Sequence, residues 1–293
     1  MWVERTNMKS FAINEVPAEI VGRASCGYPE IDWIMGCSED ASGVSWGVPQ
    51  GKITMVAGES GVGKSRWSIA MACSLANNGM RVLYIQNEVN LGTFAGWVQG
   101  RVSKPENFRV ANGRDLSDLV DTIQELRPQI VFLDSINQMN EFGSGSKTKI
   151  SVILEGDDKT LGLRDLCNNI GIHLFFISHL NQNGSVKGST TLKHLIDIVL
   201  KIVHAGAANY FLVKIGDKHR YGRTGDSYKS LWMHTDKGVD CQSNHRLEDG
   251  RWVSTHPGEK LVEYKQKIPV VKKRSTWRRF VDWSYDQCAS AGF

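Results

Sequence analysis

The chain has 293 residues, of which 41% are hydrophobic and 23% are charged. This composition is typical of a globular protein and argues against an intrinsically disordered one, and the length allows one large α/β domain with additional segments. The net charge of +4 permits a polyanionic partner such as nucleic acid but does not require one.

Cysteine spacing and hydropathy argue against zinc-knuckle, disulfide-rich, secreted and membrane proteins. The six cysteines lie far apart and include no C-x-x-C pair: Cys26, Cys37, Cys73, Cys167, Cys241 and Cys288. We therefore expect neither a zinc knuckle nor a disulfide framework. The first residues lack the apolar run of a signal peptide, and no segment approaches the roughly 20 apolar residues of a membrane helix. A cytoplasmic protein with reduced thiols and no membrane partner is expected.

Three segments are expected along the chain: an N-terminal extension (1–50), an α/β core (51–240) and a C-terminal extension (241–293). In the first, apolar residues at helical spacing predict a short helix over 29–35. The expected core strands are 53–57, 81–85, 130–133, 172–178, 198–203 and 210–214. The first expected core helix follows the glycine-rich segment 58–65 and runs to about residue 78. The other expected helices cover 116–126, 161–169 and 192–196. Short apolar strands alternating with helices predict a mostly parallel sheet flanked by helices, with antiparallel strands at its edge.

A glycine-rich loop follows the first core strand and precedes a helix. Its residues match the pattern G-x-x-x-x-G-K-S: Gly58, Glu59, Ser60, Gly61, Val62, Gly63, Lys64 and Ser65. Glycines allow successive backbone N–H groups to point at phosphate oxygens, Lys64 would reach the β and γ phosphates, and the Ser65 hydroxyl would ligate Mg²⁺. A structural glycine turn is the alternative. The strand-loop-helix context favours nucleotide binding, with ATP and Mg²⁺ as cofactors.

Three polar residues lie at or just beyond the carboxyl ends of expected strands. Asp134 could hold the magnesium ion through water, or could serve as a turn aspartate. Glu88 could orient and deprotonate a water molecule, or could be a solvated loop residue, and spacing alone leaves both open. Glu59 is a weaker candidate base because its side chain normally points away from the phosphates. His179 could sense the γ phosphate or be structural.

An ordered series of motifs resembles the RadA/Sms branch-migration ATPases and the DnaB-like ring helicases, roughly from Cys26 to Val239. The motifs are 26–32 with 48–51, 82–85 leading to Glu88, 177–180, 187–189, 195–197 and Lys218-His219-Arg220-Tyr221-Gly222. The last is similar to the K-N-R-F-G signature of RadA. This resemblance implies a RecA-like P-loop NTPase core with Glu88 as its catalytic glutamate. It also implies that Lys218 and Arg220 act at the neighbouring subunit's nucleotide, where residues alone would favour a solvated basic loop.

In these families two loops face the DNA. The first covers 140–150 and contains Lys147 and Lys149. The second covers 181–192, contains Lys187 and Gly188, and continues to Lys193. Lysines and backbone amides in such loops bind the phosphodiester backbone without regard to sequence, although each lysine alone is more often a surface charge. A basic tail with interleaved aromatic residues, 272–283, could bind single strands or dock on protein.

The expected function is an ATP-driven DNA helicase that moves as a hexameric ring on single-stranded or branched DNA. RadA-like branch migration in recombination or repair comes first, and DnaB-like unwinding in replication comes second. RecA-type strand exchange and a non-motor ATP-binding regulator are the remaining alternatives. The zinc module and Lon-like domain of RadA and the helical domain of DnaB have no counterpart in the sequence. We therefore expect a stand-alone motor core, of the kind a bacteriophage could encode for its host's cytoplasm, with recombination or replication proteins as partners.

Overall fold

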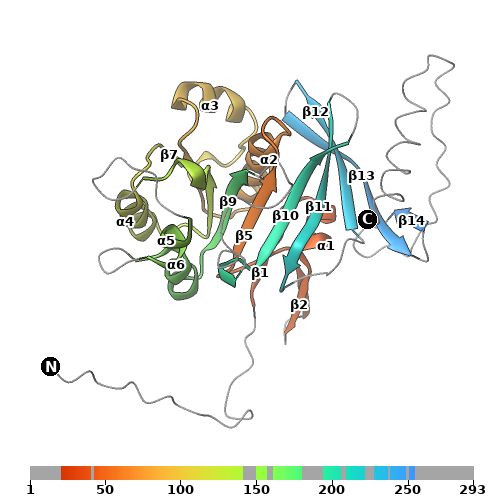
Figure 1. The fold of residues 1–293 in the computed structure, drawn as a ribbon, viewed down its shortest axis with the longest axis horizontal. Coiled ribbons are helices and arrows are strands. Elements are labelled where there is room, and N and C mark those ends of the chain that lie inside the picture. The colour runs from red at the N-terminus through yellow and green to blue at the C-terminus, as the bar shows by residue number, and fades with distance from the viewer. Residues whose placement is uncertain are drawn as a thin grey trace, which may run out of the picture.

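The computed structural model describes residues 21–40, 43–140, 150–156, 161–179, 194–205, 209–221, 228–236, 238–248 and 251–254. Within them, a ten-stranded sheet forms the centre, in the order β14-β13-β12-β11-β10-β5-β9-β8-β6-β7 (Figure 1). Two small sheets lie in the N-terminal segment. One pairs β1 (Arg23–Ala24) with β4 (Val48–Pro49), and the other pairs β2 (Cys37–Asp40) with β3 (Gly43–Trp46).

One half of the large sheet is parallel. Its strands are β5 (Ile53–Gly58), β6 (Val82–Gln86), β7 (Phe108–Ala111), β8 (Ile130–Asp134), β9 (His173–His179) and β10 (Ile198–His204). Every residue of β5, β6 and β8 is buried, as is typical of strands covered on both faces. The predicted mostly parallel sheet is confirmed.

The other half of the sheet is antiparallel. It consists of β11 (Tyr210–His219), β12 (Tyr228–Thr235), β13 (Gly238–Glu248) and β14 (Arg251–Ser254), which continue from β10. Antiparallel strands at the edge were expected, and the observed set is larger than one hairpin. Because β13 runs through residue 240, the sheet continues past the expected start of the C-terminal extension.

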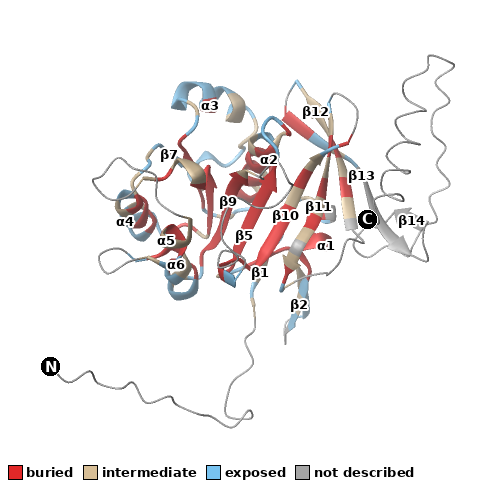
Figure 2. Ribbon diagram, viewed as in Figure 1, coloured by how far each residue is buried: buried red, intermediate tan, exposed pale blue. Residues whose placement is uncertain are grey.

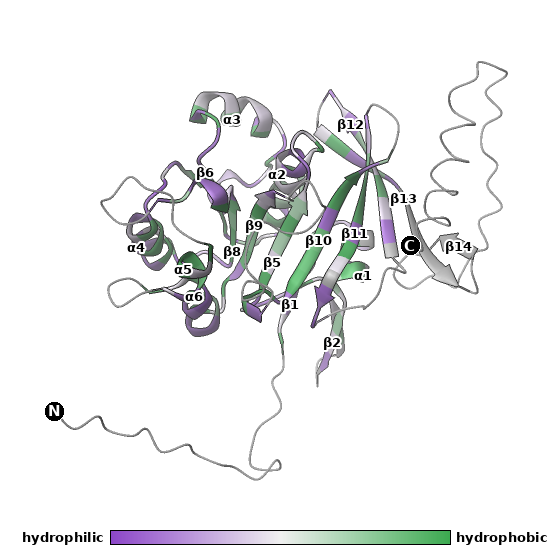
Figure 3. Cartoon of the chain, in the orientation of Figure 1, coloured by the Kyte–Doolittle hydropathy of each residue, from purple (hydrophilic) through white to green (hydrophobic). Residues whose placement is uncertain are grey.

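Two hydrophobic clusters cover the two faces of the sheet (Figure 2). The first contains residues of α1 (Pro29–Met35), α2 (Lys64–Asn77) and α3 (Leu91–Val98), together with Trp232 of β12. The second contains residues of α4 (Leu116–Leu126), α5 (Ile150–Glu155) and α6 (Leu163–Ile170). Short 3-10 turns are η2 (Pro105–Asn107) and η3 (Ile136–Gln138). Figure 3 shows the matching pattern, with hydrophobic residues along β10 and hydrophilic ones on α4.

The direction of the parallel strands decides where a site can form. The carboxyl ends of β5, β6, β8 and β9 meet at one edge of the sheet, where loops rather than strands continue the chain. Ligands of open α/β sheets bind at this edge. The predicted helices over 29–35 and 116–126 have the expected bounds. Among the described residues, no helix combines the length and hydropathy that crossing a bilayer requires.

Candidate nucleotide site

The glycine-rich loop lies between β5 and α2. Gly63 precedes α2 with φ of 106°, and Gly61 has φ of 78°, both in the left-handed region that favours glycine. A Cβ on Gly58 would lie 2.4 Å from the carbonyl oxygen of Ile202, so the close approach of β10 also requires glycine. The loop therefore adopts the tight turn that a phosphate-binding backbone needs.

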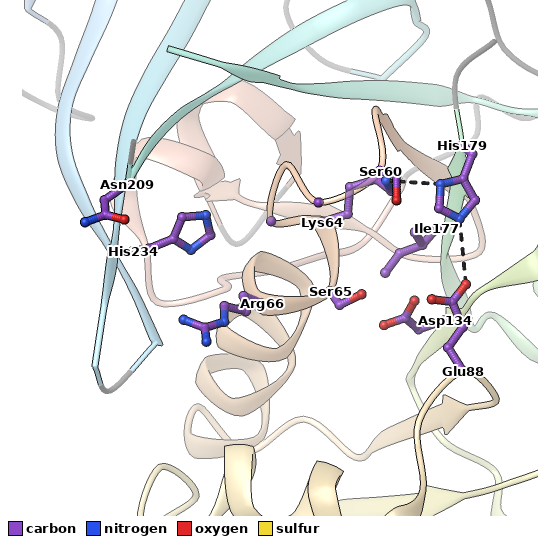
Figure 4. Close-up of a pocket in the computed structure, with 12 residues that line it drawn as sticks. Ser60, Lys64, Ser65, Arg66, Glu88, Asp134, Ile177, His179, Asn209 and His234 are labelled. Carbon is purple, nitrogen blue, oxygen red and sulfur yellow. Dashed lines mark hydrogen bonds and ion pairs between the residues drawn. The ribbon is translucent and has the colours of Figure 1, made fainter. Parts of the chain in front are cut away.

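A cavity of about 440 Å³ opens beside this loop (Figure 4). Its lining combines residues of the loop and α2 with residues in or next to β6, β8, β9, β11 and β12. They are Ser60, Gly61, Gly63, Lys64, Ser65, Arg66, Glu88, Asp134, Ile177, His179, Asn209 and His234. The structure thus brings Glu88, Asp134 and His179, which are far apart in sequence, to the predicted loop residues Ser60, Gly61, Gly63, Lys64 and Ser65.

Lys64 is buried at the first position of α2. Its ammonium donates hydrogen bonds to the carbonyl oxygens of Gly58 (2.9 Å) and Glu59 (2.6 Å). Burial lowers its pKa, and the negative charges of Glu88 and Asp134 oppose that shift. The cation is therefore held at the loop by neutral acceptors, beside two carboxylates.

Asp134 is the last residue of β8 and is buried. The Tyr84 hydroxyl donates to its Oδ2 at 3.0 Å, while its Oδ1 has no hydrogen-bond partner among the described residues. Burial raises the pKa of Asp134 from 3.8 to about 6, and the Ser65 hydroxyl opposes this shift. A buried carboxylate oxygen without a donor, close to a serine hydroxyl, fits a hard cation such as Mg²⁺.

The protein atoms alone do not form a complete metal site. No group of three or more His, Cys, Asp or Glu side chains with metal-binding geometry occurs within the described ranges. Magnesium in nucleotide sites is typically held by one or two protein oxygens together with phosphate and water oxygens. Ser65 and Asp134 could supply these one or two protein oxygens.

Glu88 lies beyond the end of β6 and faces the cavity. Its Oε1 accepts a hydrogen bond from the Ser135 hydroxyl at 2.6 Å. The side-chain oxygen of Gln86 accepts the backbone N–H groups of Glu88 (2.8 Å) and Val89 (3.3 Å), which fixes the turn. The carboxylate is 32% exposed, so it can reach both water and a bound ligand.

His179 connects these charged groups at the end of β9. Its Nδ1 lies 3.4 Å from the Lys64 ammonium, and its Nε2 lies 3.7 Å from Oε1 of Glu88. Figure 4 shows both interactions as dashed lines across the cavity. The imidazole therefore contacts both the phosphate-loop lysine and the candidate base.

The cavity also has walls that the sequence interpretation missed. His234 of β12 donates its backbone N–H to the Asn209 carbonyl at 2.7 Å, and its ring would lie 2.5 Å from a Cβ on Gly63. Burial lowers the pKa of His234, and the nearby Arg66 lowers it further. Arg66 could have been found from sequence, because it directly follows the loop motif. Asn209 and His234 could not, because only the folded antiparallel strands bring them to the cavity.

Asn87 is a further residue that the sequence analysis missed, although it directly precedes Glu88. Its amide is buried and spans two loops: Oδ1 accepts the Ser135 N–H (2.7 Å), and Nδ2 donates to the Ser135 carbonyl (3.1 Å). Its backbone N–H donates to the Asp134 carbonyl at 3.0 Å. Asn87 thereby joins the loop of the candidate base to the loop of the candidate metal ligand.

Lys218 and Arg220 lie away from this cavity. The Arg220 guanidinium pairs with Asp197 at 3.3 Å, next to Ile53 at the amino end of β5. At about 3.3 Å per residue, β5 places this end on the order of 15 Å from the loop. The two cations therefore do not reach the nucleotide cavity of their own chain. The expected DNA-contacting residues Lys147, Lys149, Lys187, Gly188 and Lys193 lie outside the described residues.

Comparison with known proteins agrees with this geometry. A family described as an AAA domain matches residues 41–185. The DNA repair protein RadA of Aquifex aeolicus is 26% identical over 194 residues, which cover 66% of this chain and 42% of that protein. RadA of Mycolicibacterium smegmatis is 25% identical over 222 residues, covering 74% of this chain and 45% of that protein. This chain is thus similar in sequence to part of the RadA proteins. It spans less than half the length of these curated relatives.

Solved structures show the same fold. A KaiC-like protein from Pyrococcus horikoshii superposes with a TM-score of 0.55 at 16% identity, covering 76% of this chain and 99% of the other. The flagellar accessory protein FlaH from Methanocaldococcus jannaschii gives 0.51 at 13% identity, covering 67% and 91%. The RecA-like fold and the resemblance to RadA are thus confirmed. The resemblance to DnaB and the bacteriophage origin stay predictions.

Proposed function

We propose that this RadA-like chain hydrolyses ATP to move on single-stranded or branched DNA, as a hexameric ring that drives branch migration in recombination or repair. The observation that supports it most is the single cavity in which a phosphate loop, a buried strand-end aspartate and a carboxylate beside a histidine converge. The similarity to proteins named DNA repair protein RadA supports the DNA substrate.

The residues divide the chemistry of hydrolysis among them. The loop N–H groups and Lys64 would bind the phosphates, and Ser65 and Asp134 would hold Mg²⁺. A bound Mg²⁺ would supply positive charge to the β and γ phosphates. Glu88, held by the Ser135 hydroxyl, orients the attacking water and accepts its proton. His179 contacts both Lys64 and Glu88, so it can transmit the state of the γ phosphate to the chain beyond β9.

Lys218 and Arg220 complete the site of the neighbouring subunit. Their distance from the cavity of their own chain supports a role between subunits, because two cations at the γ phosphate would stabilise its developing charge there. Rapid hydrolysis would then require that subunits assemble, as they do in the proposed hexameric ring. The loops 140–150 and 181–192 contact the DNA backbone in the same proposal.

The experiment that tests branch migration compares two DNA substrates. The purified chain with ATP is given a three-strand recombination intermediate and, separately, a replication fork without recombinase. Extension of the intermediate with little fork unwinding is expected. Fork unwinding alone would replace the proposal with a DnaB-like helicase, and strand exchange between homologous duplexes would replace it with a recombinase. Hydrolysis without any DNA effect would indicate an ATP-binding regulator.

A further inference from the structure

Asp197 is a buried carboxylate between β5 and the Lys218–Arg220 segment, outside the nucleotide cavity. Its Oδ2 accepts the Ile53 backbone N–H at 3.0 Å, and its own N–H donates to the Ile53 carbonyl at 3.0 Å. Its Oδ1 accepts from the Arg220 guanidinium at 3.3 Å, and its carbonyl accepts the Arg220 backbone N–H at 3.0 Å. Each carboxylate oxygen thus has a different partner.

The arginine held by Asp197 is half-exposed, with 43% of its side chain accessible, whereas the Asp197 side chain is only 8% exposed. The buried Asp197 carboxylate therefore holds one side of the Arg220 guanidinium, while the rest of the arginine side chain is exposed. The next residue is also held: the Arg23 guanidinium donates to the Tyr221 carbonyl, and the Lys52 ammonium lies 4.6 Å from the Tyr221 ring centre. The segment is therefore attached at Arg220 itself and at the residue that follows it.

Charge also favours an orienting role. The positive charges of Arg220 and Arg164 both act on the ammonium of Lys218. Burial lowers the pKa of Lys218, and Arg220 lowers it further, whereas the negative charge of Asp197 raises it. Without Asp197 the cations of this segment would repel one another, and the guanidinium would lose its buried anchor.

We propose that Asp197 is the positioning residue of Arg220, which it orients toward the nucleotide of the neighbouring subunit. This inference rests on the proposed action of Arg220 between subunits. A purely structural role is the alternative, since Oδ2 also fastens β5, the strand that carries the phosphate loop at its other end. The two roles predict opposite defects: the first impairs the neighbour's site, and the second impairs the chain's own site.

The variant Asp197→Asn separates the two partners. An asparagine keeps one carbonyl oxygen for the Ile53 N–H and removes the charge that pairs with Arg220. The KM for ATP is expected to stay within about twofold, because the cavity of the same chain is intact, while kcat falls by at least about tenfold. Asp121→Asn is the matched control, since Asp121 is an exposed residue of α4 and should leave both constants unchanged.

Mixed oligomers decide which site is impaired. Lys64→Ala subunits cannot hydrolyse ATP but carry Arg220, whereas Arg220→Ala subunits have an intact cavity but no guanidinium. Mixing these two should restore turnover at the interfaces that combine both intact halves. Asp197→Asn is expected to behave as Arg220→Ala does: it regains turnover with Lys64→Ala and gains none with Arg220→Ala.

The outcomes are distinguishable. If Lys64→Ala and Arg220→Ala fail to restore each other, action between subunits is wrong and this inference falls with it. If they do restore each other but Asp197→Asn also restores Arg220→Ala, the aspartate serves its own chain and only the inference is overturned. A fully active Asp197→Asn variant would overturn it as well. Bound ADP measured for each variant confirms that the cavity has folded.

Discussion

At the scale of single residues, two carboxylates in one cavity have different surroundings. Burial raises the pKa of Asp134 to about 6, and the hydrogen bond from Tyr84 opposes this shift. Glu88, in contrast, is a third exposed and accepts from the Ser135 hydroxyl. The buried carboxylate is suited to a cation, and the accessible one is suited to water. Two substitutions test this division of roles.

Replacing Glu88 by glutamine should abolish turnover without abolishing binding. The amide keeps the shape of the side chain but cannot accept the water's proton, so kcat should fall by about a hundredfold or more. ATP affinity should remain close to that of the parent chain. Phosphate release and fluorescent-nucleotide titration measure the two properties. Glu125→Gln, the same change on an exposed face of α4, is the control. A Glu88→Gln variant with more than a tenth of parental turnover would remove Glu88 as base.

Replacing Asp134 by asparagine should stabilise the nucleotide-free chain at neutral pH. Because folding raises this pKa, the stability associated with the protonated carboxyl is fully present below 3.8 and is lost as pH rises through about 6. A shift of that size corresponds to at most about 3 kcal/mol at pH 7.5. Urea unfolding without Mg²⁺ at pH 7.5 and pH 5 measures it. The gain should shrink at pH 5, and a loss of stability at pH 7.5 would contradict the assignment.

At the scale of elements, the loops after β6 and β8 act as one unit. Asn87 joins them through Ser135 and the Asp134 carbonyl, so the candidate base and the candidate metal ligand keep a fixed separation. The site is therefore held by contacts between two neighbouring loops as well as by the strands themselves.

Replacing Asn87 by alanine should therefore affect both stability and rate. It leaves buried backbone groups of Ser135 without partners, which costs about 1–3 kcal/mol in the free energy of unfolding. The rate should fall more than in Asn107→Ala, a control that also removes a side-chain bond to a backbone carbonyl, that of Ala76, away from the cavity. Urea unfolding and phosphate release give both values. Equal rates in the two variants would show that the hydrogen bonds between Asn87 and Ser135 have no part in catalysis.

Elements with continuous apolar sequence were predictable, and those with mixed sequence were not. Strands β6, β8 and β9 come from buried hydrophobic runs, and Glu88, Asp134 and His179 at or just beyond their ends lie around the phosphate loop. Helix α3 was missed because Gly92 and Gly96 weaken its helical signal, although the Asn90 side chain caps it. His234 was missed because only the folded antiparallel strands bring it to Gly63.

At the scale of the whole molecule, the sheet separates two sets of charged residues. The cavity lies at the carboxyl end of β5, and Lys218 and Arg220 lie near its amino end. In the proposed ring each chain would present half of a composite site at each end of the sheet, as head-to-tail assembly requires. The sequence motifs predicted each half, but only the three-dimensional arrangement shows that they cannot meet within one chain.

The central claim is that this arrangement makes a DNA-dependent ATPase. Phosphate release by the purified chain, measured with and without single-stranded DNA, tests it most directly, with Lys64→Ala as the control that should be inactive in both conditions. DNA is expected to raise the parental rate several-fold. An equal rate with and without DNA would contradict it and favour a regulator that binds ATP without moving on DNA.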